Sequence, residues 1–288
     1  MYDLKQNNIN LKIMVRYKTG LKFIYPDQIH GHMIDPEQVR EAPLNGEYPF
    51  YQKSKWFRFW QNMLNILFIV VAIPLCSIRY GLKVKGRKNL RTYAKELKNG
   101  YITTCNHVFD WDYICVRAAM EPRRSYFLAW IRNHNSKLGK LMRVTGSMPI
   151  PCLYEGMKKF NRDIKDLFVD KRWLHVYPEA SMWYYEEGIR PFKNGTFSIA
   201  YDNKVPVIPL AISYRPARGL FKLWKKHGYP CITITIGKPE RADYSLDRRN
   251  SVLELNHRIH DLSLKMKEQA TPLISEDKQE EIVARAHA

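Results

Sequence analysis

The chain has 288 residues, of which 47 are Lys or Arg and 28 are Asp or Glu, so that its formal net charge is +19. Hydrophobic residues make up 45% of the chain, which excludes an intrinsically disordered protein, because such chains bury too little apolar surface to offset the entropy of ordering. The charge predicts a polyanionic partner, namely nucleic acid, an anionic membrane surface or a phosphorylated substrate. The five cysteines form no C-x-x-C pair, which argues against a disulfide framework or a structural zinc site.

The first 55 residues predict an irregular N-terminal arm. They mix charged, polar and aromatic residues, and prolines interrupt them at positions 26, 36, 43 and 49, where they favour turns and loops. Two short strands are expected within the arm, at residues 12–17 and 21–25.

Residues 56–80 predict a membrane-associated helix. Residues 62–78 (NMLNILFIVVAIPLCSI) contain no charged residue, and their number lies at the lower limit for a bilayer span. Tryptophan and phenylalanine precede this run and Tyr80 follows it, as is typical of side chains at the two membrane–water interfaces. The run therefore predicts a helix that spans the membrane or dips into it; a buried core helix is the alternative that the same length permits.

The segment that follows is strongly basic, with seven Lys or Arg and no acidic residue within residues 79–95. Each cation near an anionic membrane contributes about 1 kcal/mol of attraction, and cations beside an apolar helix favour the cytoplasmic side. The sequence therefore predicts a membrane-associated protein whose domain downstream of the helix lies on the cytoplasmic face.

Short apolar runs alternate with helical patterns from residue 81 onward. Strands are expected at 81–85, 101–105, 125–130, 173–177, 206–214 and 231–237, and helices at 110–120, 137–145, 157–172, 192–203 and 251–269. This alternation predicts an α/β domain over residues 81–270, with a mixed, mostly parallel sheet flanked by helices. The last segment, 271–288, is a polar tail, and its last dozen residues are expected to be frayed.

The residues that point to chemistry lie within 102–120 (ITTCNHVFDWDYICVRAAM). A predicted strand ends just before Asn106 and His107, and Asp112 follows in the first turn of a predicted helix. Strand ends that enter helices are where α/β sheets place their sites, and the carboxylate can there orient one imidazole nitrogen while the other acts as a general base. On spacing alone, a helix-capping Asp beside an incidental His is the stronger interpretation, because short motifs often match by chance.

Three further blocks change this balance. Together with residues 106–112 (NHVFDWD), the chain contains VYPEAS, RPFKNGTF and VPVIPL, at 176–181, 190–197 and 205–210. In this order they resemble the N-H-x-x-x-x-D, F-P-E-G-T-R-S, P-F-K-x-G-x-F and V-P-I-x-P-V blocks of the glycerophospholipid acyltransferases, which include the lysophosphatidic acid acyltransferases. The resemblance covers about residues 80–240.

The resemblance implies transfer of a fatty acyl group from acyl-CoA or acyl-carrier protein to a hydroxyl of a lysophospholipid, with lysophosphatidic acid as the expected acceptor. It makes His107 the general base and Asp112 its orienting partner. The residues expected to bind substrate are Asn106, Glu179, Arg190, Lys193 and Gly195. No metal and no bound cofactor are expected, because an activated hydroxyl can attack a thioester without either.

Two departures from the family pattern concern the acceptor. The family's G-x-x-F-I-D-R block aligns with GSMPIPC at 146–152, so that Cys152 stands where an Arg is expected, and Met182 stands where F-P-E-G-T-R-S has its Arg. Both missing arginines are expected to hold the acceptor phosphate, because Arg binds phosphate in a bidentate manner. Arg190 and Lys193 are the candidates to replace them.

Three alternatives follow. The acceptor can be a glycolipid or another lysolipid, or the chain can be a non-catalytic membrane lipid-binding protein that has kept the fold. A nucleic-acid binder rests on the +19 charge alone, since the chain has no zinc-knuckle or RRM-like motif to support it, and no nucleic acid is expected as a partner.

Overall fold

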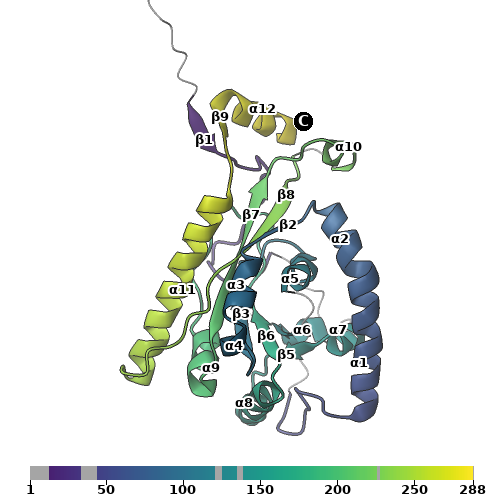
Figure 1. Ribbon diagram of the computed structural model, residues 1–288, viewed down its shortest axis with the longest axis vertical. Coiled ribbons are helices and arrows are strands. Elements are labelled where there is room, and N and C mark those ends of the chain that lie inside the picture. The colour runs from purple at the N-terminus through teal and green to yellow at the C-terminus, as the bar shows by residue number, and fades with distance from the viewer. Residues whose placement is uncertain (1–12, 34–43, 121–124, 135–138, 226–227, 288) are drawn as a thin grey trace, which may run out of the picture.

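The computed structural model describes residues 13–33, 44–120, 125–134, 139–225 and 228–287. Its centre is a seven-stranded sheet in the order β2-β8-β7-β3-β6-β4-β5 (Figure 1). Its strands are β2 (Lys83–Lys85), β3 (Tyr101–Thr104), β4 (Ser125–Ala129), β5 (Ser147–Pro149), β6 (Trp173–Val176), β7 (Val207–Arg215) and β8 (Cys231–Ile236). Only the β7–β8 pair is antiparallel among these neighbours, which confirms the predicted mixed, mostly parallel sheet.

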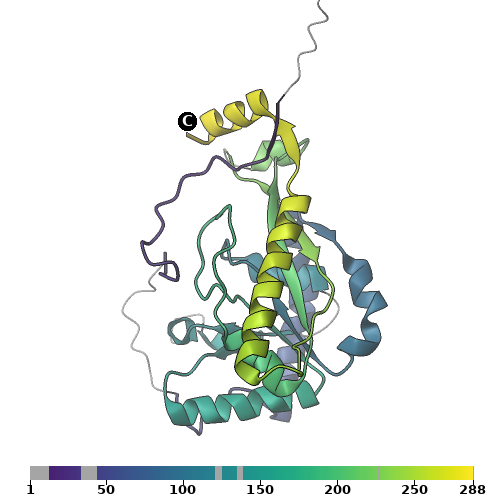
Figure 2. The ribbon, with the colours of Figure 1, turned by 90° about the vertical axis from the view of Figure 1, so that its left-hand side faces the viewer.

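Helices cover both faces of this sheet (Figures 1 and 2). One face carries α8 (Tyr154–Val169), α9 (Gly195–Asn203) and α11 (Arg248–Ala270), and the other carries α5 (Asp112–Met120). Neighbouring residues of β3 enter opposite cores, Tyr101 on the α5 side and Ile102 on the α8 side. Strands buried on both faces read as continuous apolar runs, which is why the sequence located them.

The remaining short helices of the domain lie in its connections. They are α3 (Arg87–Thr92), α4 (Ala94–Leu97), α6 (Ile131–His134), α7 (Gly139–Val144) and α10 (Phe221–Trp224). Of these, only α7 was expected, because helices of one or two turns leave little periodicity in a sequence.

Two predictions at the chain ends are wrong. The last dozen residues are not frayed where the structure describes them: α12 (Glu276–His287) follows β9 (Leu273–Ser275), which pairs antiparallel with β1 (Met14–Arg16). This pairing joins segments about 260 residues apart, and no local pattern reveals such a partner. Residues 21–25 form no strand; Leu21, Phe23 and Tyr25 pack against the domain instead. The predicted strand at 12–17 is β1, except that residue 12 lies outside the described residues.

One continuous helix of 25 residues runs along the domain before the sheet begins (Figure 1). It consists of α1 (Lys55–Leu67), the π-helical segment η1 (Phe68–Ala72) and α2 (Ile73–Arg79). By length and composition it is apolar enough to cross a membrane. Its exposed face is almost entirely apolar and contains Trp56, Phe59, Trp60, Met63, Ile66, Leu67, Val70, Val71, Leu75 and Ile78.

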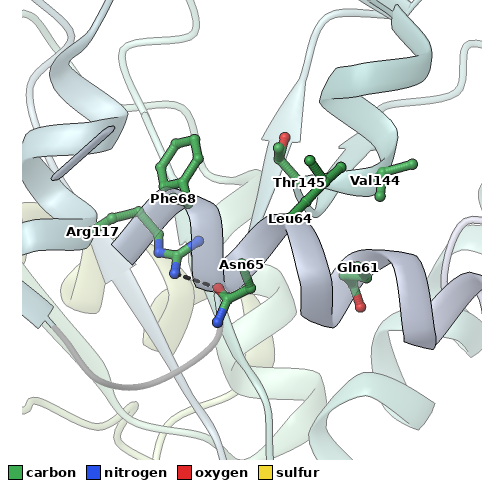
Figure 3. Close-up of a pocket in the computed structure, with 7 residues that line it drawn as sticks. All are labelled: Gln61, Leu64, Asn65, Phe68, Arg117, Val144 and Thr145. Carbon is green, nitrogen blue, oxygen red and sulfur yellow. Dashed lines mark hydrogen bonds between the residues drawn. The ribbon is translucent and has the colours of Figure 1, made fainter. Parts of the chain in front are cut away.

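The face of this helix that meets the domain is partly polar. The Tyr126 hydroxyl donates to Gln61 Oε1 at 2.9 Å, and Arg117 Nη2 donates to Asn65 Oδ1 at 2.6 Å (Figure 3). An ordinary surface helix turns its apolar stripe inward, whereas this helix turns Gln61 and Asn65 inward and most of its large apolar side chains outward.

Candidate active site

His107 and Asp112 meet at the carboxyl edge of the sheet, as the family resemblance implied. Asp112 is the first residue of α5, where the helix dipole favours a carboxylate. His107 Nδ1 lies 2.7 Å from Asp112 Oδ2. The carboxylate is buried, while 26% of the imidazole side chain is exposed. Among the described residues, no hydrogen-bond partner occupies His107 Nε2. An imidazole held in this way can act as a general base, because the carboxylate fixes its tautomer.

The Asp112 carboxylate accepts further hydrogen bonds that hold it in place. The backbone N–H of Val108 donates to Oδ2 at 2.9 Å, and that of Phe109 at 3.4 Å. The Tyr177 hydroxyl donates to Oδ1 at 2.6 Å. These backbone donors are therefore directed at the carboxylate and are not open to a substrate oxyanion.

Tyr177 is a residue of the site that the sequence analysis missed. Its ring stacks on the His107 imidazole with centroids 3.9 Å apart and planes 13° apart. Burial and the Asp112 charge raise the pKa of Tyr177 well above its ordinary value, so that the hydroxyl stays protonated and donates. The place of Tyr177 beside His107 follows from the sheet, because β3 pairs in parallel with β6, with Thr104 opposite Val176. The residues that follow these strands therefore emerge side by side.

Replacing Tyr177 with Phe is expected to keep the stacked ring and remove one hydrogen bond to the carboxylate. Hydrogen bonds to charged groups contribute about 1.5–3 kcal/mol, so the free energy of unfolding should fall by that amount and turnover by about tenfold. Chemical denaturation and initial rates measure the two effects. Unchanged turnover would show that the hydroxyl does not help to position the Asp112 carboxylate for the reaction.

Glu179 lies beneath the pair rather than facing solvent. Its Oε2 accepts from the His107 backbone N–H at 3.2 Å and from Arg190 Nη2 at 3.0 Å, and its Oε1 accepts from the Arg190 backbone N–H at 3.0 Å. Burial outweighs the attraction of Arg190 and raises the pKa of Glu179. Glu179 therefore supports the loop that carries His107 and does not touch an acceptor directly.

Arg190 is not available for an acceptor phosphate. Only 6% of its side chain is exposed. Besides Glu179, its guanidinium donates to Ser181 Oγ at 2.6 Å and to the carbonyl of Ile29 at 3.0 Å, and it lies over the Trp183 ring. The sequence made Arg190 a candidate to replace the missing family arginines, but it could not show that buried partners occupy the side chain.

The other expected substrate-binding residues divide into two groups. Asn106 is buried and bonds through its side chain to the backbone N–H of Ile212 at 2.8 Å and to its carbonyl at 3.2 Å, so that it joins β3 to β7 and faces no substrate. Lys193 and Gly195 are exposed near the start of α9. The Lys193 backbone N–H donates to the Pro178 carbonyl, and the residue as a whole is exposed to solvent.

Behind Tyr177 lies His175, a second histidine close to the pair. It is fully buried, and its Nδ1 lies 2.8 Å from Thr103 Oγ1. Burial lowers the pKa of His175 to about 3, so this imidazole is neutral at neutral pH. It packs inside the domain as an uncharged side chain.

A pH dependence of stability follows from His175. Below about pH 6.5 the unfolded chain binds a proton on this imidazole, whereas the folded protein does not until about pH 3. The free energy of unfolding should therefore fall as the pH decreases through this window, by roughly 3–5 kcal/mol from this group. His175→Gln should flatten the profile relative to wild type in denaturant unfolding between pH 7 and pH 4. Parallel profiles would contradict the assignment.

Within the described ranges, no group of three or more His, Cys, Asp or Glu side chains is placed to hold a metal ion.

The site lies within the part of the chain that matches a known protein family. The family model described as Acyltransferase matches residues 81–213, a range that includes His107, Asp112, Tyr177, Glu179 and Arg190. The arm and the long apolar helix lie outside it.

Two curated relatives are similar over this region. The chain is 26% identical over 166 residues to the 1-acyl-sn-glycerol-3-phosphate acyltransferase of Saccharomyces cerevisiae, covering 55% of this chain and 51% of that protein. It is 25% identical over 219 residues to the protein of the same name from Bacillus subtilis, covering 73% of this chain and 98% of that protein. The chain thus spans about half the length of the yeast relative and nearly all of the bacterial one.

Among solved structures, the chain is similar to the 1-acyl-sn-glycerophosphate acyltransferase PlsC from Thermotoga maritima. The TM-score is 0.40 and the identity 17%, with 63% of this chain and 71% of that chain covered.

Proposed function

We propose that the protein transfers a fatty acyl group from a thioester to a hydroxyl of a lysophospholipid, on the basis that residues 81–213 match the Acyltransferase family model. The observation that carries the proposal is the His107–Asp112 pair at 2.7 Å, with Nε2 open at the carboxyl edge of the sheet. Both curated relatives are named for acylation of 1-acyl-glycerol-3-phosphate.

The proposed reaction needs one base. His107 Nε2 takes the proton of the acceptor hydroxyl while its oxygen attacks the thioester carbonyl. The tetrahedral intermediate then collapses with cleavage of the carbon–sulfur bond, and the thiolate takes the proton from the imidazolium. Asp112 stabilises this imidazolium and holds the ring orientation. The products are the ester and a free thiol, and no redox step is involved.

Lysophosphatidic acid is the proposed acceptor, and acyl-CoA or acyl-carrier protein the proposed donor. Lys193 is the exposed cation that we assign to the acceptor phosphate. The buried position of Arg190 favours, as a second candidate, an acceptor without a terminal phosphate monoester, such as a glycolipid or another lysolipid.

An acceptor panel tests the proposal. Purified full-length protein is incubated with labelled acyl-CoA or acyl-carrier protein and with lysophosphatidic acid, a lysophospholipid with a larger headgroup, and a glycolipid, and the products are identified by mass. A product larger than one acceptor by one acyl group supports the proposal and names the acceptor. A chain that binds these lipids without consuming either thioester would instead be a lipid-binding protein.

The proposed location is the surface of an anionic membrane, with the 25-residue helix lying in the interface. At 1.5 Å per residue the helix is about 37 Å long, and both α1 and α2 pack against the domain (Figure 1), so that a perpendicular crossing would draw the domain into the bilayer. An interfacial helix instead buries only its apolar face in the headgroup boundary. The seven cations of residues 79–95 are all exposed and can contact anionic headgroups.

Two acidic substitutions on the apolar face, Ile66→Glu with Val70→Glu, are expected to weaken binding to anionic vesicles at least about tenfold, because burial of each such side chain contributes about 1.5–3 kcal/mol. Flotation of the protein with vesicles measures this. Leu246→Glu is the matched control, because Leu246 precedes α11 on the opposite side of the domain (Figures 1 and 2). Equal flotation of both variants would exclude the helix as the membrane contact.

A further inference from the structure

The N-terminal arm lies outside the matched acyltransferase domain, yet it crosses the sheet edge at which His107 lies. The His32 ring stacks on Trp130, which directly follows β4, with centroids 4.1 Å apart. The Tyr25 ring stacks on Trp183, in the loop that follows β6, at 5.0 Å and 14°. Because β3, β6 and β4 are neighbouring parallel strands, their carboxyl ends share one edge, and the arm runs across it.

Hydrogen bonds also join the arm to Trp183 and Tyr184, in the loop that follows β6. The Trp183 indole N–H donates to the carbonyl of Gly31 at 2.8 Å, and the Tyr25 hydroxyl donates to the carbonyl of Tyr184 at 2.9 Å. With the Tyr25 ring on one side, Trp183 is buried. The arm therefore determines the position of Trp183.

The arm also contacts the ion pair beneath His107. His30 Nδ1 lies 3.0 Å from the carbonyl oxygen of Glu179, a distance at which the ring N–H donates. Arg190 Nη1 donates to the carbonyl of Ile29 at 3.0 Å. Both members of the buried pair are thus held by arm residues that follow one another in sequence.

The same loop fixes the backbone of the proposed base from two directions. The backbone N–H of Trp183 donates to the carbonyl of His107 at 3.1 Å, and Glu179 Oε2 accepts from the backbone N–H of His107 at 3.2 Å. Both backbone groups of His107 are therefore bonded to residues that the arm holds in place.

We infer that arm residues Tyr25 and His30 are positioning residues for acyl transfer, acting through the loop at 179–190 on the backbone of His107. The inference rests on the proposed function. Small displacements of a reacting group can lower its rate about 100-fold. Because the loop at 179–190 positions the His107 backbone, the contacts that fix this loop also fix the position of the base. In this chain the arm performs that task from outside the family domain.

Paired double variants of the full-length protein test this inference. Tyr25→Ala with His30→Ala removes the stack and the donor, whereas Tyr25→Phe with His30→Asn keeps a ring and an N–H near the Nδ1 position. The Ala pair is expected to lower kcat about 10–100-fold, with KM for the thioester changed less than about twofold, as expected of residues that position the base and do not bind the donor. The Phe/Asn pair should recover most of the loss. Ile24→Ala is the matched control, because this neighbouring side chain is 96% exposed.

The outcomes separate this inference from the proposed function. Wild type that transfers no acyl group to any acceptor refutes the function. Active wild type with an Ala pair as active as Ile24→Ala overturns the positioning role alone, as does a loss of kcat that the Phe/Asn pair does not recover. Thermal unfolding of every variant establishes that it is folded at the assay temperature; if the Ala pair is not, the single variant His30→Ala is compared with His30→Asn under the same criteria.

Discussion

Replacement of His107 with Ala is expected to lower acyl transfer about 10²–10⁴-fold, the usual contribution of a general base. The imidazole is the titratable side chain whose open nitrogen lies at the edge of the site, and Asp112, at 2.7 Å, has its remaining acceptor positions filled by backbone and Tyr177 donors. Without the ring, no other group of this constellation can accept the proton of an acceptor hydroxyl. Initial rates with labelled thioester measure the loss.

A control variant and a vesicle-binding measurement accompany this experiment. His257→Ala removes an exposed histidine on α11 and should retain wild-type turnover. Binding of His107→Ala to anionic vesicles should equal that of wild type, because the apolar helix is untouched. Substantial turnover by His107→Ala would refute its assignment as the base.

Replacement of Glu179 with Gln is expected to destabilise the fold by about 3–5 kcal/mol, the cost of leaving a buried charge without its partner. Gln keeps the size of the side chain and can still accept one backbone hydrogen bond, but the Arg190 guanidinium, which is also almost fully buried, loses its counter-charge. Because the free energy of unfolding of a typical domain is about 5–15 kcal/mol, much of the stability would be lost. Urea unfolding monitored by circular dichroism measures the change.

Two variants check that the unpaired charge is the cause. Adding Arg190→Met to Glu179→Gln removes the orphaned cation and should recover part of the stability, as replacement of buried pairs by apolar residues often does. Glu155→Gln breaks an exposed pair with Lys158 and should cost less than about 1 kcal/mol. Equal losses in Glu155→Gln and Glu179→Gln would contradict the importance of burial.

Much of the fold could be predicted because its elements carry local patterns. The β8 sequence CITITI contains five consecutive β-branched residues, and the strands that lie in the centre of the sheet read as apolar runs. The ends of the chain could not be predicted in this way. Ile274 becomes buried only because β9 pairs with β1, and that pairing depends on contacts between opposite ends of the sequence.

The same distinction holds at the site. His107 and Asp112 are five residues apart, so that one strand-to-helix turn brings them together, and the sequence could anticipate the contact. The burial of Arg190 depends on Ser181 and on the carbonyl of Ile29, which is 161 residues away. The contacts of Tyr25 and His30 with the loop depend likewise on tertiary structure, and the irregular pattern of the arm gave no indication of them.

The product balance of the wild-type reaction is the most direct measurement. Full-length protein in anionic vesicles is given labelled acyl-CoA or acyl-carrier protein together with lysophosphatidic acid, and the ester product and the free thiol are counted against the thioester consumed. If His107 activates the acceptor hydroxyl, one ester and one thiol appear for each thioester, and both disappear together in His107→Ala. Consumption of thioester without ester, or no consumption with either donor, would contradict the proposed acyl transfer to this acceptor.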